Sequence, residues 1–265
     1  MRLKSKVLII AGSDSSGGAG IQADIKTVTS LGSYAMTAIT AVTAQNTTGV
    51  KSIIPIHPKE ISNQIEYSAK DIRPQAIKIG MLHSKQVILA VNKSLNKIKI
   101  KKIILDPVMV AKGGARLLFE DAVVALSEYL LPRATLLTPN IPEAEALTGI
   151  KASDEAALYQ IGETLLEKGA QAVLLKGGHL IGSTIVDRLF TSSGVEIFKN
   201  PRIDTRHTHG TGCTLASAIA AGISDGLTIS DAVNKAEIYL HKAIEGAPGF
   251  GSGYGPIDHT HTVRK

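Results

Sequence analysis

Residues 207–222, HTHGTGCTLASAIAAG, contain the only cysteine of the chain. Cys213 follows Gly210 and Gly212 and precedes a run that is typical of a helix. Backbone N–H groups of such a glycine stretch and of a helix N-terminus can bind an anion such as a phosphate, with Thr211 beside it. Because the helix start also favours a thiolate, we expect a lowered Cys213 pKa and a role as general base for a hydroxyl. A small buried cysteine without a chemical role is the alternative.

A second glycine-rich stretch, AGSDSSGGAGIQAD at residues 11–24, stands between an expected strand and an expected helix. Residues 18–23 fit a dinucleotide fingerprint, but residues 44–46 offer no carboxylate at the distance where that fingerprint needs one. Glycines allow a backbone to approach a ligand closely, and ligands bind at the strand ends of open α/β sheets. We therefore interpret the stretch as a substrate loop, with a merely tight turn as the alternative. The sequence has no Walker A motif.

Polar residues follow three further apolar runs. Asp106 in LDPVM and Lys176 in LLKGGH stand at the ends of expected buried strands, where a lysine could neutralise phosphate charge. Asn140 and Glu143 in TPNIPEAE could reach magnesium or phosphate, directly or through water. The alternatives are turn chemistry at Asp106, a surface turn at Lys176, and a helix capping box formed by Asn140 and Glu143.

The elements that must position these residues follow from the hydropathy pattern, in which short apolar runs alternate with amphipathic runs. Strands are expected at residues 7–11, 36–43, 76–79, 103–106, 135–138, 172–176, 185–190 and 195–198, and helices at 21–31, 58–71, 84–98, 121–131, 156–168, 214–225 and 230–246. Strands that are apolar throughout are buried on both faces. The pattern predicts an α/β protein with a mainly parallel sheet between helices, forming one domain over residues 1–265. Residues 249–265 are expected to form an irregular tail in which His259 and His261 are solvated.

Composition excludes several classes of protein. The chain has 265 residues, 44% of them hydrophobic and 20% charged, and no apolar run long enough to span a membrane. The apolar run at 7–11 is too short for a signal peptide, so we expect a cytoplasmic protein. A single cysteine excludes an internal disulfide and a multi-cysteine metal site. Scattered lysines and few aromatic residues give no reason to expect nucleic-acid binding, whereas a net charge of +6 suits small anionic substrates.

The sequence resembles the hydroxymethylpyrimidine/phosphomethylpyrimidine kinases of thiamine biosynthesis, which belong to the ribokinase-like superfamily. The motifs that carry this resemblance extend over nearly the whole chain: AGSDSSGGAGIQADIKT, AITAVTAQNT, KIGML, DPVMVAKGGARLL, LLTPNIPEAEALTG, LLKGGH and HTHGTGCTLASAIAAG. The resemblance implies a three-layer αβα fold and a kinase that uses ATP and Mg²⁺. It would phosphorylate 4-amino-5-hydroxymethyl-2-methylpyrimidine to the monophosphate and then to the diphosphate. Ser16 departs from the family, which often has glycine there, and we expect a small side chain to be tolerated.

The resemblance also implies roles for individual residues. The substrate pocket would be formed by Gln45, which would hydrogen-bond the aminopyrimidine, and by Asp24, Gly12, Ala19, Met81 and Val108. In the phosphate region, Gly210 and Gly212 would form the anion hole and Cys213 would act as the base. Lys176 and Thr211 would bind phosphate, and magnesium would lie near Asn140, Glu143 and Asp106. Members of the family are often homodimers, and a homodimer is expected here by analogy.

Three other functions remain open at this point. A pyridoxal or pyridoxine kinase would share the fold and accept a ring of similar shape. A cysteine-nucleophile acyl transferase would need a histidine to orient the thiol, for which His207 and His209 are available. A vitamin-binding protein without catalytic activity would bind ligand but release no ADP.

Overall fold

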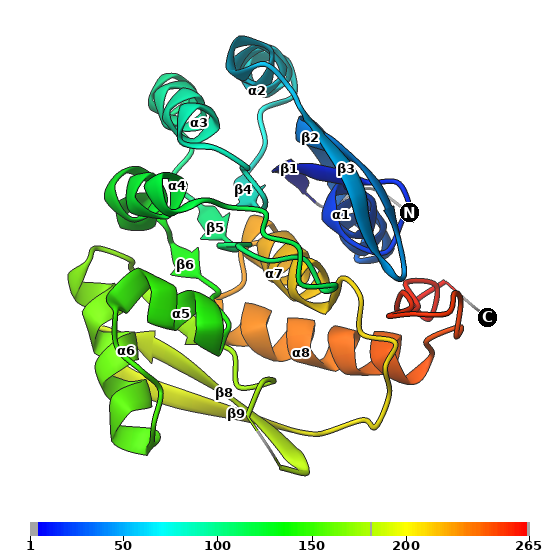
Figure 1. Cartoon of the computed structure of the whole chain (residues 1–265). Coiled ribbons are helices and arrows are strands. Elements are labelled where there is room, and N and C mark those ends of the chain that lie inside the picture. Colours follow the sequence, from blue (N-terminus) through cyan, green and yellow to red (C-terminus); the bar gives the residue numbers. More distant parts are fainter. Residues whose placement is uncertain (1–4, 181, 264–265) are drawn as a thin grey trace.

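The computed structural model describes residues 5–180 and 182–263, and its described part contains a nine-stranded sheet between two layers of helices (Figure 1). The strand order is β3-β2-β1-β4-β5-β6-β7-β8-β9. The strands are β1 (Lys6–Asp14), β2 (Tyr34–Asn46), β3 (Gly49–Pro55), β4 (Ala76–Ile79), β5 (Ile103–Leu105), β6 (Leu136–Leu137), β7 (Ala172–Leu175), β8 (Thr184–Thr191) and β9 (Gly194–Pro201). Pairing is parallel from β2 through β1, β4, β5 and β6 to β7, and antiparallel for β3, β8 and β9. The expected α/β fold with a mainly parallel sheet is thus confirmed.

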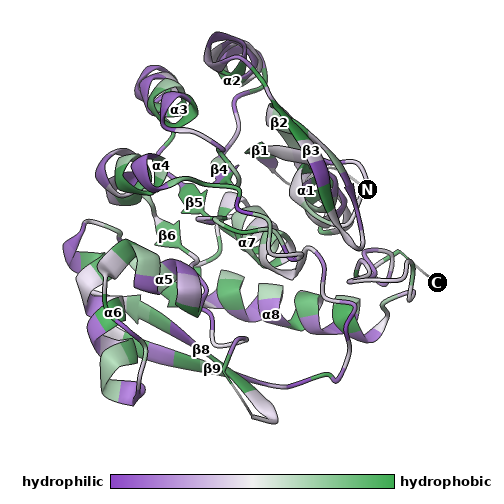
Figure 2. Cartoon of the chain, in the orientation of Figure 1, coloured by the Kyte–Doolittle hydropathy of each residue, from purple (hydrophilic) through white to green (hydrophobic). Residues whose placement is uncertain are grey.

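Helices cover both faces because the central strands are apolar on both sides. The helices are α1 (Gly20–Ser30), α2 (Pro58–Ile72), α3 (Lys85–Ile98), α4 (Glu120–Ala125), α5 (Ile141–Thr148), α6 (Glu155–Glu167), α7 (Thr211–Ser224) and α8 (Ile229–Glu245). One core unites buried side chains of α2, α3, α4 and α6 with one face of the sheet, and a second core unites α1, α7 and α8 with the other. In Figure 2, hydrophilic residues lie on the outer faces of α2, α3 and α4.

Helix α7 is the element that brings the glycine–cysteine stretch to the sheet. Every residue from Thr214 to Ser224 is buried, as expected for a helix that is apolar on all sides. Small residues such as Ala216 and Ala220 allow α1, α8 and the sheet to pack closely around it. The first turn of α7 therefore lies at the carboxyl ends of the parallel strands.

Three elements differ from the expectation. Strand β3 was not expected, because its residues are half-buried or exposed and carry no alternating pattern. Where the structure has helix α5, the sequence indicated only a capping box at Asn140 and Glu143. The helix expected at 121–131 is divided into α4, a π-helical turn at Leu126–Leu130 and a 3₁₀ turn at Leu131–Arg133. Pro132 has no N–H to continue the α-helical ladder, which explains why the helix ends in an irregular form.

The C-terminal stretch is irregular, as expected, but the expectation that its histidines are solvated is wrong for His259. Its ring is 6% exposed, and its Nδ1 lies 3.2 Å from the Tyr239 hydroxyl and 3.3 Å from Thr27 Oγ1. Burial lowers the pKa of His259 to about 4. The ring fills space between α1 and α8 and ties the stretch to the second core. Within the described residues, no helix is long and apolar enough to cross a membrane.

Candidate active site

A cavity of about 1440 Å³ opens at the carboxyl ends of the parallel strands. Thirteen of the fourteen residues that the sequence placed in the site line it: Gly12, Ala19, Gln45, Met81, Asp106, Val108, Asn140, Glu143, Lys176, Gly210, Thr211, Gly212 and Cys213. They lie near the carboxyl ends of β1 and β2, in the segments that follow β1, β4, β5, β6 and β7, and at the start of α7. The topology collects them because parallel strands end at one edge of the sheet.

The glycine stretch before α7 has the conformation that an anion site requires. Gly210 caps the helix with φ +85°, and a Cβ atom at this position would meet the Gly18 carbonyl oxygen. The first intrahelical bond runs from the Thr214 N–H to the Gly210 carbonyl, so the N–H groups of Gly212 and Cys213 have no acceptor within the helix. These two N–H groups, together with the helix dipole, favour a negative group in the cavity.

Lys176 and Asp106 lie beside this helix start. Lys176 Nζ is 3.1 Å from Asp106 Oδ1, and a Cβ atom at Gly212 would lie 3.5 Å from the same Nζ. Burial alone would lower the pKa of Lys176, but the carboxylates of Asp106 and Glu143 outweigh it and raise the pKa, so the lysine stays protonated. A positive charge therefore faces the free N–H groups of α7. The alternative of a surface lysine at a turn is excluded by the burial of Lys176, with 13% of its side chain exposed.

Asn140 and Glu143 form the capping box of α5. The Glu143 N–H donates to Asn140 Oδ1 over 2.9 Å, and the Asn140 N–H donates to Glu143 Oε2 over 2.8 Å. Both residues also line the cavity, so the structural and the ligand-facing interpretations hold together. Burial, with a contribution from the Asp106 charge, raises the pKa of Glu143 to about 7, while Lys176 opposes the shift.

Cys213 lies in the cavity wall half-buried, and its expected low pKa is wrong for the ligand-free protein. Burial raises the pKa of the thiol to about 11, although the charge of Lys78 and the N–H of Gly20 both oppose the shift. Desolvation of the thiolate therefore outweighs the helix start. At neutral pH the thiol therefore faces the cavity in its protonated form.

Asp24 is the one expected pocket residue that does not line the cavity, which corrects its expected role in the substrate pocket. Its side chain is fully buried, and both of its oxygens lie 2.9 Å from Lys78 Nζ. Ser217 Oγ of α7 donates a further hydrogen bond over 2.7 Å. Asp24 therefore lies beneath the cavity and holds Lys78, which does line it. Burial would lower the pKa of Lys78, but the Asp24 carboxylate outweighs burial and raises it.

An apolar wall faces Gln45 at the other side of the cavity. Met81 and Val108 pack with Ala41 and Leu117 in a small cluster of their own. Gly12 leaves room for this wall, because a Cβ atom there would lie 2.7 Å from Met81 Cε. A flat ring could lie on this wall with its polar edge toward the Gln45 amide.

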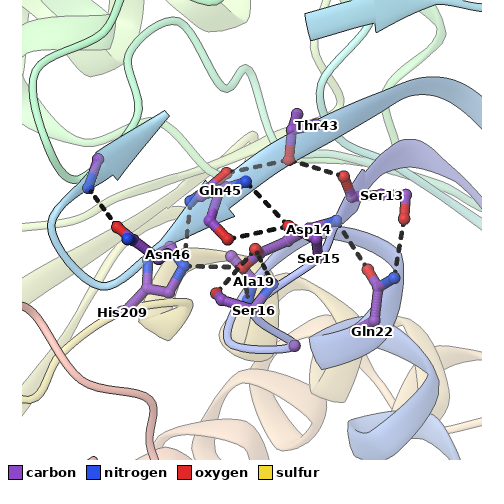
Figure 3. Close-up of polar contacts among 12 residues, drawn as sticks. Ser13, Asp14, Ser15, Ser16, Ala19, Gln22, Thr43, Gln45, Asn46 and His209 are labelled. Carbon is purple, nitrogen blue, oxygen red and sulfur yellow. Dashed lines mark hydrogen bonds and ion pairs between the residues drawn. The ribbon is translucent and has the colours of Figure 1, made fainter. Parts of the chain in front are cut away.

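Figure 3 shows the polar network around Gln45. His209 Nε2 lies 2.8 Å from Asp14 Oδ2 and 3.2 Å from the Gln45 amide. Ser15 Oγ bonds both backbone groups of Gln45, over 2.8 and 2.9 Å. No hydrogen bond in the described part of the chain joins a histidine to Cys213, which disfavours the acyl transferase.

Three polar residues that line the cavity, Lys78, Asp14 and His209, were not predicted as part of the kinase site. Lys78 was detectable, because a charged residue within the apolar strand AIKI must find a buried partner. His209 was considered only as a partner of a cysteine nucleophile, and its pairing with Asp14 carried no signal, since 195 residues separate the two along the chain.

Comparison with known proteins assigns the family. The family model described as phosphomethylpyrimidine kinase matches residues 14–258. The chain belongs to the phosphomethylpyrimidine kinase family. It is 46% identical over 255 residues to the hydroxymethylpyrimidine/phosphomethylpyrimidine kinase of Bacillus subtilis, an alignment that covers 96% of this chain and 94% of that protein. It is also 47% identical over 256 residues to the thiamine biosynthesis bifunctional protein ThiED of Geobacter sulfurreducens; this covers 97% of the chain but only 52% of that longer protein.

The fold of this family member is shared with a solved kinase of different name. A crystal structure of an ADP complex of Bacillus subtilis pyridoxal kinase superposes with a TM-score of 0.90 and 34% sequence identity, over 97% of this chain and 98% of that one. The resemblance stated from the sequence motifs and the ribokinase-like fold are therefore confirmed.

Proposed function

We propose that the chain is an ATP-dependent phosphotransferase that phosphorylates 4-amino-5-hydroxymethyl-2-methylpyrimidine to its monophosphate and then to its diphosphate. The observation that carries this proposal is the convergence of the α7 N-terminus, Lys176 and Asp106 on one point of the cavity. A transferring phosphoryl group carries negative charge on its equatorial oxygens, and two N–H groups with a lysine stabilise that charge. A homologue named hydroxymethylpyrimidine/phosphomethylpyrimidine kinase, at 46% identity, supports the same activity.

The two substrates would enter from opposite sides of the sheet. Gln45 lies at the C-terminal end of β2, near one edge of the sheet, and the pyrimidine would bind there between the amide and the wall of Met81 and Val108. The cavity is also lined by two apolar side chains, Ile203, which follows β9 at the other edge of the sheet, and Leu240 of α8. These side chains suit an adenine ring, and Thr211, Gly212, Lys176 and Asn140 would then contact the phosphates between the two rings.

Asp106, Glu143 and Asn140 would hold Mg²⁺, directly or through water. The donor set fits, because Mg²⁺ prefers carboxylate and amide oxygens and keeps several of its waters. Asp106 lines the cavity, and its buried Oδ2 has no hydrogen-bond partner among the described residues. A buried oxygen of this kind is available to bind a ligand such as a metal ion. Bound Mg²⁺ would neutralise charge on the transferring phosphate oxygens.

Cys213 would accept the proton of the substrate hydroxyl in the first phosphorylation. Its thiol must ionise before or while it does so, and Lys78 is the cation that most favours this in the ligand-free protein. The monophosphate has no hydroxyl proton to lose at the reacting oxygen, so the second phosphorylation does not need this base.

A coupled assay of ADP release tests the proposal. The protein is incubated with ATP, Mg²⁺ and the pyrimidine alcohol, and products are separated by mass. ATP-dependent appearance of the monophosphate and then of the diphosphate is expected. Lys176→Met should lower kcat by at least about 100-fold, as expected when charge stabilisation of a transition state is lost. The control Lys151→Met, at a lysine with 85% of its side chain exposed, should leave it unchanged. ADP release without a phosphorylated pyrimidine would contradict the proposal.

Pyridoxal is a second candidate substrate, because the Bacillus subtilis pyridoxal kinase superposes over nearly the whole chain. The lower identity to that enzyme, 34% against 46% to the pyrimidine kinase of the same organism, favours the pyrimidine. A competition assay with both substrates decides between them, and equal or faster turnover of pyridoxal would replace the proposal.

The assembly and the location are proposed by analogy alone. We expect a homodimer in the cytoplasm, formed from one domain that spans residues 1–265. Light scattering at micromolar concentration would show a mass of twice 27.9 kDa if the dimer forms.

A further inference from the structure

The contact between His209 and Asp14 fixes which atom carries a proton. Asp14 is ionised, because hydrogen bonds from His209, Ser16 and Ala19 outweigh burial and lower its pKa. A carboxylate only accepts hydrogen bonds, so His209 Nε2, at 2.8 Å from Asp14 Oδ2, must be the donor. Both side chains are nearly buried, with 6% and 4% exposed, and water therefore does not replace either partner.

The same contact orients the Gln45 amide. The structure places Gln45 Nε2 3.2 Å from His209 Nε2, an arrangement that would set two donors against each other. A half-turn of the amide exchanges its nitrogen and oxygen, and only then does an acceptor lie beside the Nε2 proton, which it shares with Asp14. At the other end of the amide, Gln45 Oε1 lies 3.3 Å from Thr43 Oγ1, whose single proton has a closer acceptor in the Ser13 carbonyl at 2.9 Å. The same half-turn of the amide would bring its nitrogen to Thr43. Thr43 can therefore only accept, and it pairs with the amide nitrogen. Both ends demand the same orientation, with the oxygen toward His209 and the NH₂ group toward Thr43.

His209 is itself held rigidly between two loops. Its N–H donates to the Gly255 carbonyl over 3.1 Å, so the C-terminal stretch supports it from one side. Its ring packs against Gly18, where a Cβ atom would lie 2.4 Å from the ring. The adjacent Gly210 begins the anion-binding helix. A buried hydrogen bond between Asp14 and His209 thus connects the glycine loop to the Gln45 amide (Figure 3).

We propose that His209 is a positioning residue that fixes the Gln45 amide in one orientation and thereby selects an amino-substituted ring over an oxo-substituted one. An amide edge presents one acceptor and one donor in a fixed order. A 4-aminopyrimidine offers the matching donor on its amino group and acceptor on N3, whereas a 4-oxo ring with N3–H offers the reverse order. A freely rotating amide would bind both rings, but an amide held by His209 and Thr43 rejects the oxo ring. This selection rests on the proposed pyrimidine site.

Calorimetric titration without ATP tests the inference with two probes, 4-amino-5-hydroxymethyl-2-methylpyrimidine and its 4-oxo counterpart. The wild-type protein should prefer the amino probe by about 10- to 100-fold, the value of two neutral hydrogen bonds. In His209→Ala the preference should fall below about 3-fold, because the amide can rotate. His209→Gln keeps a donor at the reach of Nε2 and should restore the wild-type preference. His57→Ala, at an exposed histidine outside the cavity wall, should not change it.

The outcomes separate this inference from the proposed function. If the wild-type protein binds neither probe, the proposed pyrimidine site is wrong. If it prefers the amino probe and His209→Ala keeps that preference, His209 does not orient the amide and the inference is overturned. Equal loss of affinity for both probes in His209→Ala would also overturn it, because a collapsed loop affects both rings alike. Should His209→Ala fail to fold, His209→Leu replaces it, because leucine fills much of the space of the ring but has no donor, and an unchanged preference there has the same meaning.

Discussion

Replacement of Lys78 by methionine should destabilise the protein strongly. Lys78 and Asp24 are both fully buried, and the lysine nitrogen lies 2.9 Å from both carboxylate oxygens. In Lys78→Met the carboxylate keeps only the neutral Ser217 hydroxyl as a partner. Removing one partner of a buried ion pair costs about 3–5 kcal/mol of the free energy of unfolding, because the other charge stays buried. A change of 1 kcal/mol shifts the midpoint by about 2–4 °C in a chain of this size, so the melting temperature should fall by about 6–20 °C.

Thermal unfolding followed by circular dichroism at pH 7 measures this difference. The double variant Lys78→Met/Asp24→Leu removes both charges and should recover most of the lost stability. Lys151→Met is the matched control, because Lys151 forms an ion pair of 2.9 Å with Glu145 but its own side chain is exposed. This substitution should lower the free energy of unfolding by less than about 1 kcal/mol.

Two results would refute the reasoning. If the melting temperature of Lys78→Met lies within 2 °C of the wild-type value, the Asp24 carboxylate does not depend on Lys78 for its stabilisation. A double variant as unstable as the single one would show that Lys78 stabilises by packing. If the double variant is stable but slow in the first phosphorylation, Lys78 also assists ionisation of Cys213.

Three further predictions concern pH. Burial lowers the pKa of His259 from 6.5 to about 4, so the unfolded chain binds more protons between these values. The stability that is present above pH 6.5 should therefore fall by on the order of 3 kcal/mol as the pH approaches 4, and His259→Gln should remove this dependence in chemical denaturation. Since burial raises the pKa of Glu143 to about 7, the apparent affinity for MgATP should weaken as the pH falls from 8 to 6; the dependence should flatten in Glu143→Gln, and a wild-type affinity independent of pH would exclude a role for this carboxylate. With a thiol pKa of about 11, alkylation of Cys213 by iodoacetamide should accelerate about tenfold per pH unit from 7 to 9, and a plateau near pH 7 would contradict the raised pKa.

Most of the fold could be predicted from the sequence because the central strands are continuously apolar and the helices between them are amphipathic. Strand β3 could not, since it is an edge strand with little burial. A turn signal was present nevertheless: Asn46 Oδ1 accepts hydrogen bonds from the N–H groups of Thr48 and Gly49 and closes the β2–β3 hairpin.

The candidate site divides in the same way. Residues that stand at strand ends or at the start of α7, such as Lys176 and Gly212, line one cavity because chain topology alone brings them together. The thiol pKa and the place of Asp24 could not be predicted in this way, because both depend on burial among residues distant in sequence. Local sequence shows a helix start, but it does not show how much water the fold leaves around it.

The role of Cys213 as proton acceptor beside the α7 N-terminus is tested most directly by the separate rates of the two phosphorylations in Cys213→Ala. Single-turnover rates are measured with ATP and either the pyrimidine alcohol or its monophosphate. The first rate should fall by about 100-fold or more, the value of a positioned general base, and the second by less than about tenfold. Equal loss in both steps, or no loss in the first, would contradict the account.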